Sequence, residues 1–297
     1  MVAAVRDEED QFLIGRLSEW LFRGRYDSRL PLFAIGALCC RMEDSGLMSA
    51  APYTKGQALV RRIARRPFYV VAALLCTFMA ALGFLPRMIR AAVAGTIPRE
   101  WIIHAHVAVY WTWLVLFFVQ TVNAALGRVQ AHKKLGVVLV GYGVVMFIAG
   151  VGVTLNRLLK QIRAGDLALA QSANLAPVVD MLVFPILLGL GIYYRRRPEV
   201  HKRLMILATT QLLYPAVVRM DFIPQYYWVV LAVWSAPVVL GMAHDWLTRR
   251  LVHPVYVTGM LLLALLTMRP NWIASRPWVE ATTRLASIAG KAEPSRQ

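Results

Sequence analysis

The 297-residue sequence predicts an all-α fold, a polytopic membrane bundle with about seven transmembrane helices. Hydrophobic residues make up 58% of the chain and charged residues only 16%, which is typical of spanning helices rather than of a soluble core. Long apolar runs recur between Phe68 and Met268, each close to the roughly 20 residues that cross a bilayer core. These runs are apolar nearly all round, whereas a helix packed on an aqueous core keeps a polar face.

Each expected span is a helix, because lipid offers no partner to an unpaired backbone N–H or C=O group. The uninterrupted runs do not have the alternating pattern of a barrel strand. Pro215 removes a backbone donor from the fifth run, so a kink is expected there. Closely spaced glycines from Gly141 to Gly152 predict tight helix packing in the third run. In chain order, the expected spans are residues 68–86, 101–124, 135–155, 177–194, 204–218, 225–243 and 251–268.

Residues 1–47 differ in charge from the rest of the chain. They carry six Lys/Arg and eight Asp/Glu, whereas the residues from Met48 onward carry 27 and 8. We expect residues 1–47 to be an N-terminal extension that is not native or is disordered; the alternative is a genuine cytoplasmic arm. Residues 48–67 are expected to form a basic cytoplasmic segment, 68–268 the transmembrane domain, and 269–297 an extracytoplasmic tail.

The chain carries a net charge of +17, and the distribution of its basic residues predicts how the protein is oriented in the membrane. Basic residues gather in the short loops of one face, with fifteen Lys/Arg there against seven in the opposite loops and five on the tail. This asymmetry predicts a membrane protein with its N-terminus in the cytoplasm and its C-terminus outside. The expected partners are the lipid bilayer and its anionic headgroups, and no nucleic acid.

Four histidines fall at the cytoplasmic ends of four different expected spans: His132, His201, His244 and His253. Histidines at one depth on several helices can build a haem or metal site inside a bundle. His132 and His201 begin two similar five-residue segments, His-Lys-Lys-Leu-Gly and His-Lys-Arg-Leu-Met. Each segment starts an outward-going helix, so the two histidines are expected at equal depth and are the expected ligands of a haem iron. His244 is a further candidate ligand, and Asp245 could accept a hydrogen bond from its second ring nitrogen. The alternative is that all four are polar residues at headgroup level.

A stripe of aromatic and polar residues follows the second expected span. Its members recur at intervals of four and three, which places them on one helix face. Such a mixture is unusual in contact with lipid, so the stripe is expected to face the bundle interior. It would line a haem, quinone or lipid pocket, or else act only as an aromatic seam between helices. The stripe consists of His106, Tyr110, Trp113, Phe117 and Gln120, of which His106, Trp113 and Gln120 are candidate cofactor-binding residues.

No soluble catalytic motif is present: the sequence has no phosphate-binding loop, Rossmann fingerprint, zinc-protease motif or nucleophile elbow. It therefore names no catalytic residue and leaves enzyme activity open. The sequence is compatible with three functions. The first is a redox role with one bound haem, the second is transport or the handling of lipid or quinone, and the third is a cofactor-free assembly or scaffold protein.

Several of these sequence segments together resemble those of a known protein family. His104-x-His106 with Trp113 and Gln120, then His132-Lys-Lys-Leu-Gly-Val, His201-Lys-Arg-Leu-Met and Pro215-Ala-Val-Val-Arg219 resemble a bacterial family of uncharacterised multi-pass membrane proteins, a domain of unknown function. The likeness covers residues 68–245 and implies an inner-membrane helical bundle without an assigned activity. The chain is also similar, more faintly, to haem-containing membrane cytochromes, but its outer histidines share one helix, unlike those of a two-haem protein.

Overall fold

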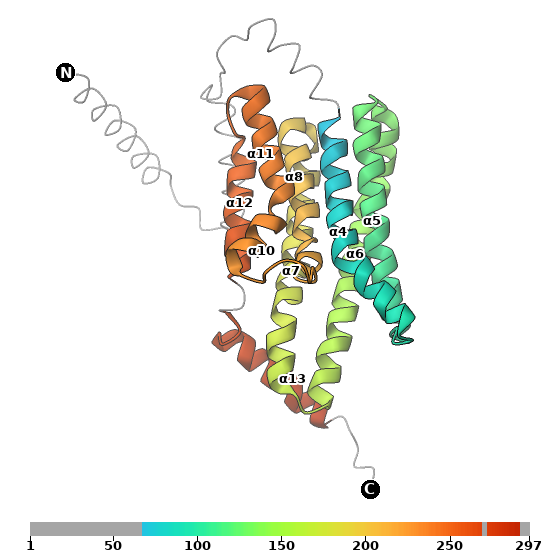
Figure 1. Ribbon diagram of the computed structural model, residues 1–297, viewed down its shortest axis with the longest axis vertical. Helices are drawn as coiled ribbons and strands as arrows, with labels where there is room; N and C mark the ends of the chain where they lie inside the picture. The colour runs from blue at the N-terminus through green and yellow to red at the C-terminus, as the bar shows by residue number, and fades with distance from the viewer. Residues whose placement is uncertain (1–66, 269–271, 292–297) are drawn as a thin grey trace, which may run out of the picture. The chain divides into compact units, whose positions relative to one another are not determined.

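The computed structural model describes residues 67–268 and 272–291 (Figure 1). These residues form helices joined by short turns, with no strand among them, and the all-α class is confirmed. The expectations for residues 1–47 and for the basic segment up to residue 66 lie outside the described part.

Four helices are long and apolar enough to cross a membrane. They are α4 (Phe68–Val93), α5 (Trp101–Ala125), α6 (Val129–Arg163) and α7 (Leu167–Tyr193), the last of which continues into the short 3-10 helix η1 (Tyr194–Arg196). They coincide with the first four expected spans and extend each of them at one or both ends. Large apolar side chains cover their outward faces, with Phe78, Ile89 and Val137 at least 60% exposed, which is the surface expected against hydrocarbon.

The last three expected spans are shorter or broken, so the count of seven is not confirmed for the described residues. The fifth becomes α8 (Pro198–Gln211) and α9 (Tyr214–Val217), and the sixth becomes α10 (Tyr227–Trp234) and α11 (Ala236–Arg249), bent by 57°. The seventh is α12 (Pro254–Thr267), only 14 residues long. A 14-residue helix extends about 21 Å, short of the roughly 30 Å hydrocarbon core. The bent pair, taken as one span, raises the count from four to five.

Prolines account for much of this fragmentation. Pro198, Pro237 and Pro254 lie in the first turns of α8, α11 and α12, where a missing N–H costs nothing. Pro215 is the second residue of α9, which starts just after α8 has ended at Gln211, so the expected kink is a complete break in the helix.

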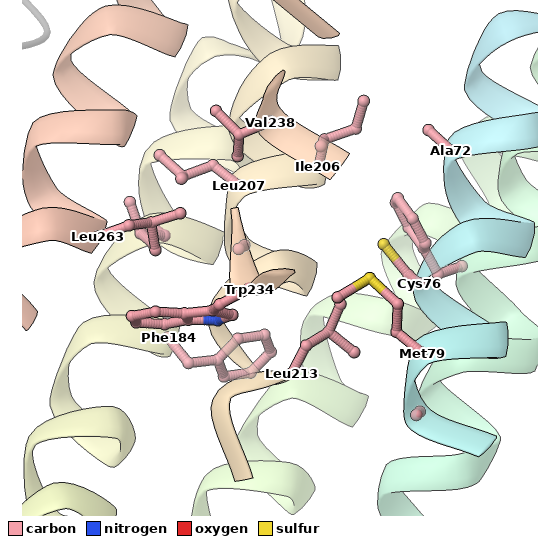
Figure 2. Packing of buried hydrophobic residues seen from close by; sticks show 14 of the residues in the cluster. Ala72, Cys76, Met79, Phe184, Ile206, Leu207, Leu213, Trp234, Val238 and Leu263 are labelled. Carbon is pink, nitrogen blue, oxygen red and sulfur yellow. The ribbon is translucent and has the colours of Figure 1, made fainter. Parts of the chain in front are cut away.

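Buried aromatic and aliphatic side chains join the helices into one core (Figure 2). Trp234 of α10 is fully buried and donates its Nε1–H to the carbonyl of Thr210 at 2.8 Å. Trp113 of α5 packs edge-on against Phe184 of α7, with ring centroids 5.4 Å apart. The expected close packing at glycines is confirmed for Gly143, where an added Cβ would overlap the Leu188 side chain of α7.

The amphipathic helix α13 (Arg276–Lys291) contacts α6 and α7 and lies across one end of that pair (Figure 1). Trp278 donates its Nε1–H to the carbonyl of Gln171 at 3.0 Å, and the Gln171 amide donates to the buried hydroxyl of Thr282. This part of the expected tail is therefore an ordered helix fixed to the bundle.

Candidate functional site

A cavity of about 540 Å³ lies among α4, α5, α6, α7 and α8. It is at the end of the bundle where α4 and α8 begin and α11 ends, which we call the Arg203 end. Its walls are largely apolar, and its volume is within the range of roughly 300–1,000 Å³ usual for small-molecule sites. Gly127, in the turn from α5 to α6, borders it with φ +70°, a left-handed conformation that glycine adopts without strain. Four of the six predicted cofactor residues line this cavity: Trp113, Gln120, His132 and His201.

His132 and His201 face one another across helices α6 and α8. Their ring centroids are 6.3 Å apart and their planes are nearly perpendicular, at 86°. The Nδ1 atom of His201 lies 2.7 Å from the carbonyl oxygen of Gly191, and that of His132 lies 3.3 Å from the carbonyl oxygen of Gln120. A carbonyl oxygen only accepts hydrogen bonds, so each neutral ring carries its proton on Nδ1 and keeps a lone pair on Nε2. Both rings are thus held in the tautomer that a metal ligand needs.

The distance between the two rings allows one metal ion between them. With metal–nitrogen bonds of about 2 Å, imidazoles on opposite sides of one ion have ring centres roughly 6 Å apart. The donor set of two imidazoles on neighbouring helices beside an apolar cavity also suits a haem better than a hard cation, which prefers oxygen ligands. Paired imidazoles beside an apolar cavity are the residue types from which a haem site inside a helical bundle is built.

Two further polar atoms at the cavity lack a hydrogen-bond partner within the described part of the chain. Trp113 is 1% exposed and its Nε1–H is unpaired, and the Oε1 atom of the buried Gln120 is also unpaired. The Gln120 amide group is oriented by its other end, because Nε2 donates to the carbonyl of His132 at 3.1 Å. A buried donor and a buried acceptor left unsatisfied cost free energy, which a bound ligand with its own polar groups would recover.

The predicted stripe on α5 faces the interior, as expected. Trp113, Phe117 and Gln120 are buried, and the cavity begins beside them. His106 and Tyr110 continue the stripe away from the cavity, with ring centroids 4.3 Å apart. His106 is therefore on the same face without lining the cavity.

His244 lies apart from the His132–His201 pair. Its ring stacks on Phe68 at 3.8 Å, and it is not among the residues that line the cavity. The Nδ1 atom of His244 is 3.9 Å from Asp245, whose two oxygens are engaged mainly by Arg203. The structure thus brings together the preferred pair and leaves the reserve histidine on a neighbouring helix.

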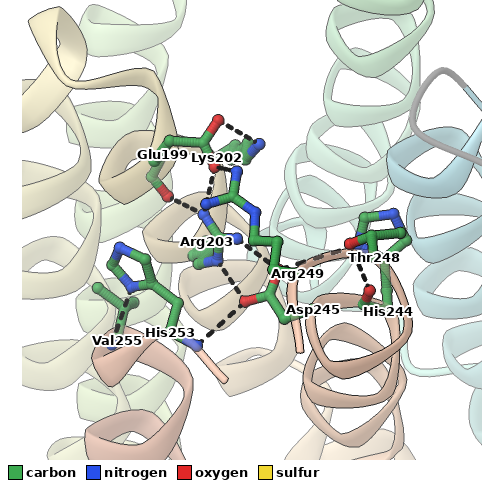
Figure 3. Close-up of polar contacts among 9 residues, drawn as sticks. All are labelled: Glu199, Lys202, Arg203, His244, Asp245, Thr248, Arg249, His253 and Val255. Carbon is green, nitrogen blue, oxygen red and sulfur yellow. Dashed lines mark hydrogen bonds and ion pairs between the residues drawn. The ribbon is translucent and has the colours of Figure 1, made fainter. Parts of the chain in front are cut away.

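Beside the cavity, a buried charge network joins α8, α11 and the start of α12 (Figure 3). Arg203 and Asp245 are both fully buried and form a two-pronged ion pair, with Nε 2.8 Å from Oδ2 and a second contact from Nη2 to Oδ1. The backbone N–H of His253 donates to the same carboxylate at 3.2 Å. Fork-to-fork pairing satisfies most of the hydrogen-bonding capacity of both groups, which is the condition for burying them.

Glu199 extends the network toward the cavity. It accepts from Arg203 at 2.9 Å, from Lys202 at 2.8 Å, and from Arg249. Lys202 lines the cavity together with Tyr69, and its ammonium group lies 5.1 Å above the Tyr69 ring. The charge of Lys202 is thus placed at the edge of the cavity.

Arg203 and Glu199 were missed as site residues by reasoning from sequence. Arg203 counts among the loop charges that set orientation, because it follows a run of basic residues before an apolar stretch. The available signal was the spacing of Glu199 and Arg203, which at four residues apart on one helix are expected to pair. The partner 42 residues along the chain, Asp245, has no such signature.

A second group of charges occupies the opposite end of the bundle, which we call the Asp221 end. The carboxylate of Asp221, in the turn after α9, pairs with Arg87 at 2.7 Å and with Arg90, both on α4. Those guanidinium groups, Arg90 first and then Arg87, hold the pKa of Asp221 below its ordinary value of 3.8. The stabilisation from this group is present above that value and is lost as the pH falls through the lower pKa of the folded protein.

Acidification is therefore expected to weaken the Asp221 end. Between pH 7 and pH 3 the wild-type protein should lose more thermal stability than Asp221→Asn, whose side chain does not titrate. Unfolding temperatures in detergent across this range measure the difference. Parallel curves for the two proteins would show that the pair contributes nothing to the pH dependence.

Comparison with known proteins adds no assignment. No protein-family model matches the chain, and neither a curated protein nor a solved structure matches it.

Proposed function

We propose that this chain is a multi-pass bacterial inner-membrane protein that holds one haem between His132 and His201 and serves a redox role. The observation that supports this is the pair itself: two imidazoles with centroids 6.3 Å apart, each with Nδ1 bound to a backbone carbonyl, at the edge of a cavity of about 540 Å³. A haem bound there would supply one-electron transfer. The apolar walls of the cavity would exclude water from a bound haem, and the fixed tautomers of His132 and His201 would present Nε2 to its iron.

The proposal includes the finer membrane topology. Counting α8 with α9, α10 with α11, and α12 as crossings gives the seven predicted spans, with buried charges such as Arg203 near the cytoplasmic face. The N-terminus is then cytoplasmic and the C-terminus extracytoplasmic, in keeping with the distribution of basic residues.

The test is an ultraviolet–visible spectrum with metal analysis of protein purified in mild detergent from haem-replete cells. We expect a Soret band that shifts on reduction. His201→Ala and His132→Ala should each lower the ratio of haem to protein at least about tenfold. His104→Ala is the matched control, because His104 is exposed and bonds the carbonyl of Pro98 away from the cavity.

A conservative variant separates ligation from folding. His201→Met should retain haem with a raised reduction potential, as expected when a thioether replaces one imidazole. Wild-type haem content and potential in all these variants, or a colourless and metal-free wild-type preparation, would refute the assignment.

A second candidate function is the handling of a quinone or another lipid-soluble molecule. It is favoured by the unpaired N–H of Trp113 and Oε1 of Gln120, which offer a donor and an acceptor to an organic ligand rather than to a metal. In that case a colourless protein should be stabilised thermally by a soluble quinone analogue, and Trp113→Phe should abolish the shift. A colourless protein without such a shift leaves the cofactor-free scaffold function.

A further inference from the structure

An open cavity of about 450 Å³ lies at the Asp221 end, far along α4 from the histidine pair. Two kinds of side chain line it. Arg90, Arg219 and Asp221 provide charge, while Leu82, Pro86 and Phe222 provide an apolar wall. The proposed haem site shares none of these residues.

Positive charge exceeds negative charge around this cavity. Asp221 is the single carboxylate shared by the guanidinium groups of Arg87 and Arg90. No carboxylate of the described residues lies within ion-pair distance of Arg219, which is partly buried in the turn after α9. Burial first, and then the charges of Arg157 and Arg87, hold the pKa of Arg219 below its ordinary value. An anion entering the cavity would relieve this repulsion.

The structure positions the Arg219 side chain for such an anion. One Nη1–H donates to the carbonyl of Pro215 at 2.6 Å, and the guanidinium group lies 5.4 Å above the ring of Phe84. These contacts fix the side chain and use only one of its five N–H donors. Guanidinium groups match the oxygens of a phosphate by bidentate hydrogen bonding, as they match a carboxylate.

We propose that Arg90 and Arg219 form a binding site for the phosphate group of an anionic ligand at the Asp221 end. The apolar wall favours a phospholipid over free phosphate. Beyond the cavity, α4 presents exposed apolar side chains along which an acyl chain could lie: Leu85, Met88 and Ile89. Only this lipid source depends on the proposed membrane embedding, and the site does not depend on the haem.

The test measures dissociation constants for the full chain in detergent micelles with two probes, a short-chain phosphatidylglycerol and inorganic phosphate. Arg219→Gln and Arg90→Gln should each raise the constant about tenfold or more, because each removes a charge-assisted contact. Arg99→Gln is the matched control, since Arg99 is an exposed arginine outside the cavity. Thermal unfolding of each variant establishes that it is folded.

Asp221→Asn provides the sharper result. It removes the carboxylate that competes with the ligand for Arg90 and that lowers the positive charge around the cavity, so binding should tighten about threefold or more. A purely structural role for these residues predicts the opposite or no change. Binding of phosphatidylglycerol alone identifies a lipid site, and binding of both probes identifies a general phosphate site. Equal dissociation constants in wild type, Arg219→Gln, Arg90→Gln and Arg99→Gln overturn the proposal.

Discussion

Asp245→Ala is expected to destabilise the protein by about 3–5 kcal/mol, because it leaves the guanidinium group of Arg203 buried without its counterion. Both side chains are fully buried, and Asp245 also accepts the backbone N–H of His253. Glu199, which is partly exposed, can offset only part of the lost interaction with Arg203. Denaturant or thermal unfolding in detergent measures the change.

Two variants show whether the charge or the packing is responsible. Arg249→Gln removes a partly exposed partner of Glu199, so its effect should stay near or below about 1 kcal/mol. The double variant Arg203→Met, Asp245→Leu replaces the pair by apolar groups and should recover most of the lost stability, as buried ion pairs often allow. If Asp245→Ala unfolds like wild type, the buried pair does not stabilise this end of the bundle.

Hydrophobic length was sufficient to predict the long helices. The runs at 68–86 and 101–124 correspond to α4 and α5, because about 20 apolar residues in sequence can satisfy their backbone only as one helix. Their ends were less accurate. Helix α6 begins at Val129 and ends at Arg163, well beyond the apolar run 135–155, since polar residues continue a helix once its backbone can reach water.

Local pattern failed where the chain breaks inside an apolar run. The bend between α10 and α11 falls at Ser235, where the sequence 225–243 has no charge and no glycine at the bend itself; Gly241 lies six residues further on, and Pro237 lies in the first turn of α11. Trp234 is fully buried beside the bend and bonds the carbonyl of Thr210, so a tertiary contact accompanies the break. Such contacts join residues that are distant in sequence, so they produce no periodic pattern from which the bend could be predicted.

Reasoning from sequence identified four residues that line the cavity and missed the charged residues beside it. Matching phrases at His132 and His201, and the helical spacing of Trp113 and Gln120, identified four residues that the cavity brings together. Chemical type and spacing carry that information in sequence. Burial does not, and the conversion of Arg203 from a loop charge to a core residue depends on the fold of α11 beside it.

Gly83→Ala is expected to be the most disruptive single-carbon addition on α4. A Cβ at Gly83 would lie 2.7 Å from the Cα of Ala216 and closer still to its carbonyl oxygen. Those are backbone atoms of α9, which cannot rotate away as a side chain can. The overlap should destabilise the protein by about 3 kcal/mol, as measured by unfolding in detergent.

Gly141→Ala on α6 is the matched control, because an added Cβ there meets nothing within 4 Å. It should be neutral or slightly stabilising, since alanine has the higher helix propensity. Equal unfolding for the two variants would show that α9 moves aside at little cost. Because Ala216 precedes Arg219 by three residues, that movement would also displace Arg219 from Arg90. Gly83→Ala should therefore weaken phosphate binding at the Asp221 end while Gly141→Ala leaves it unchanged.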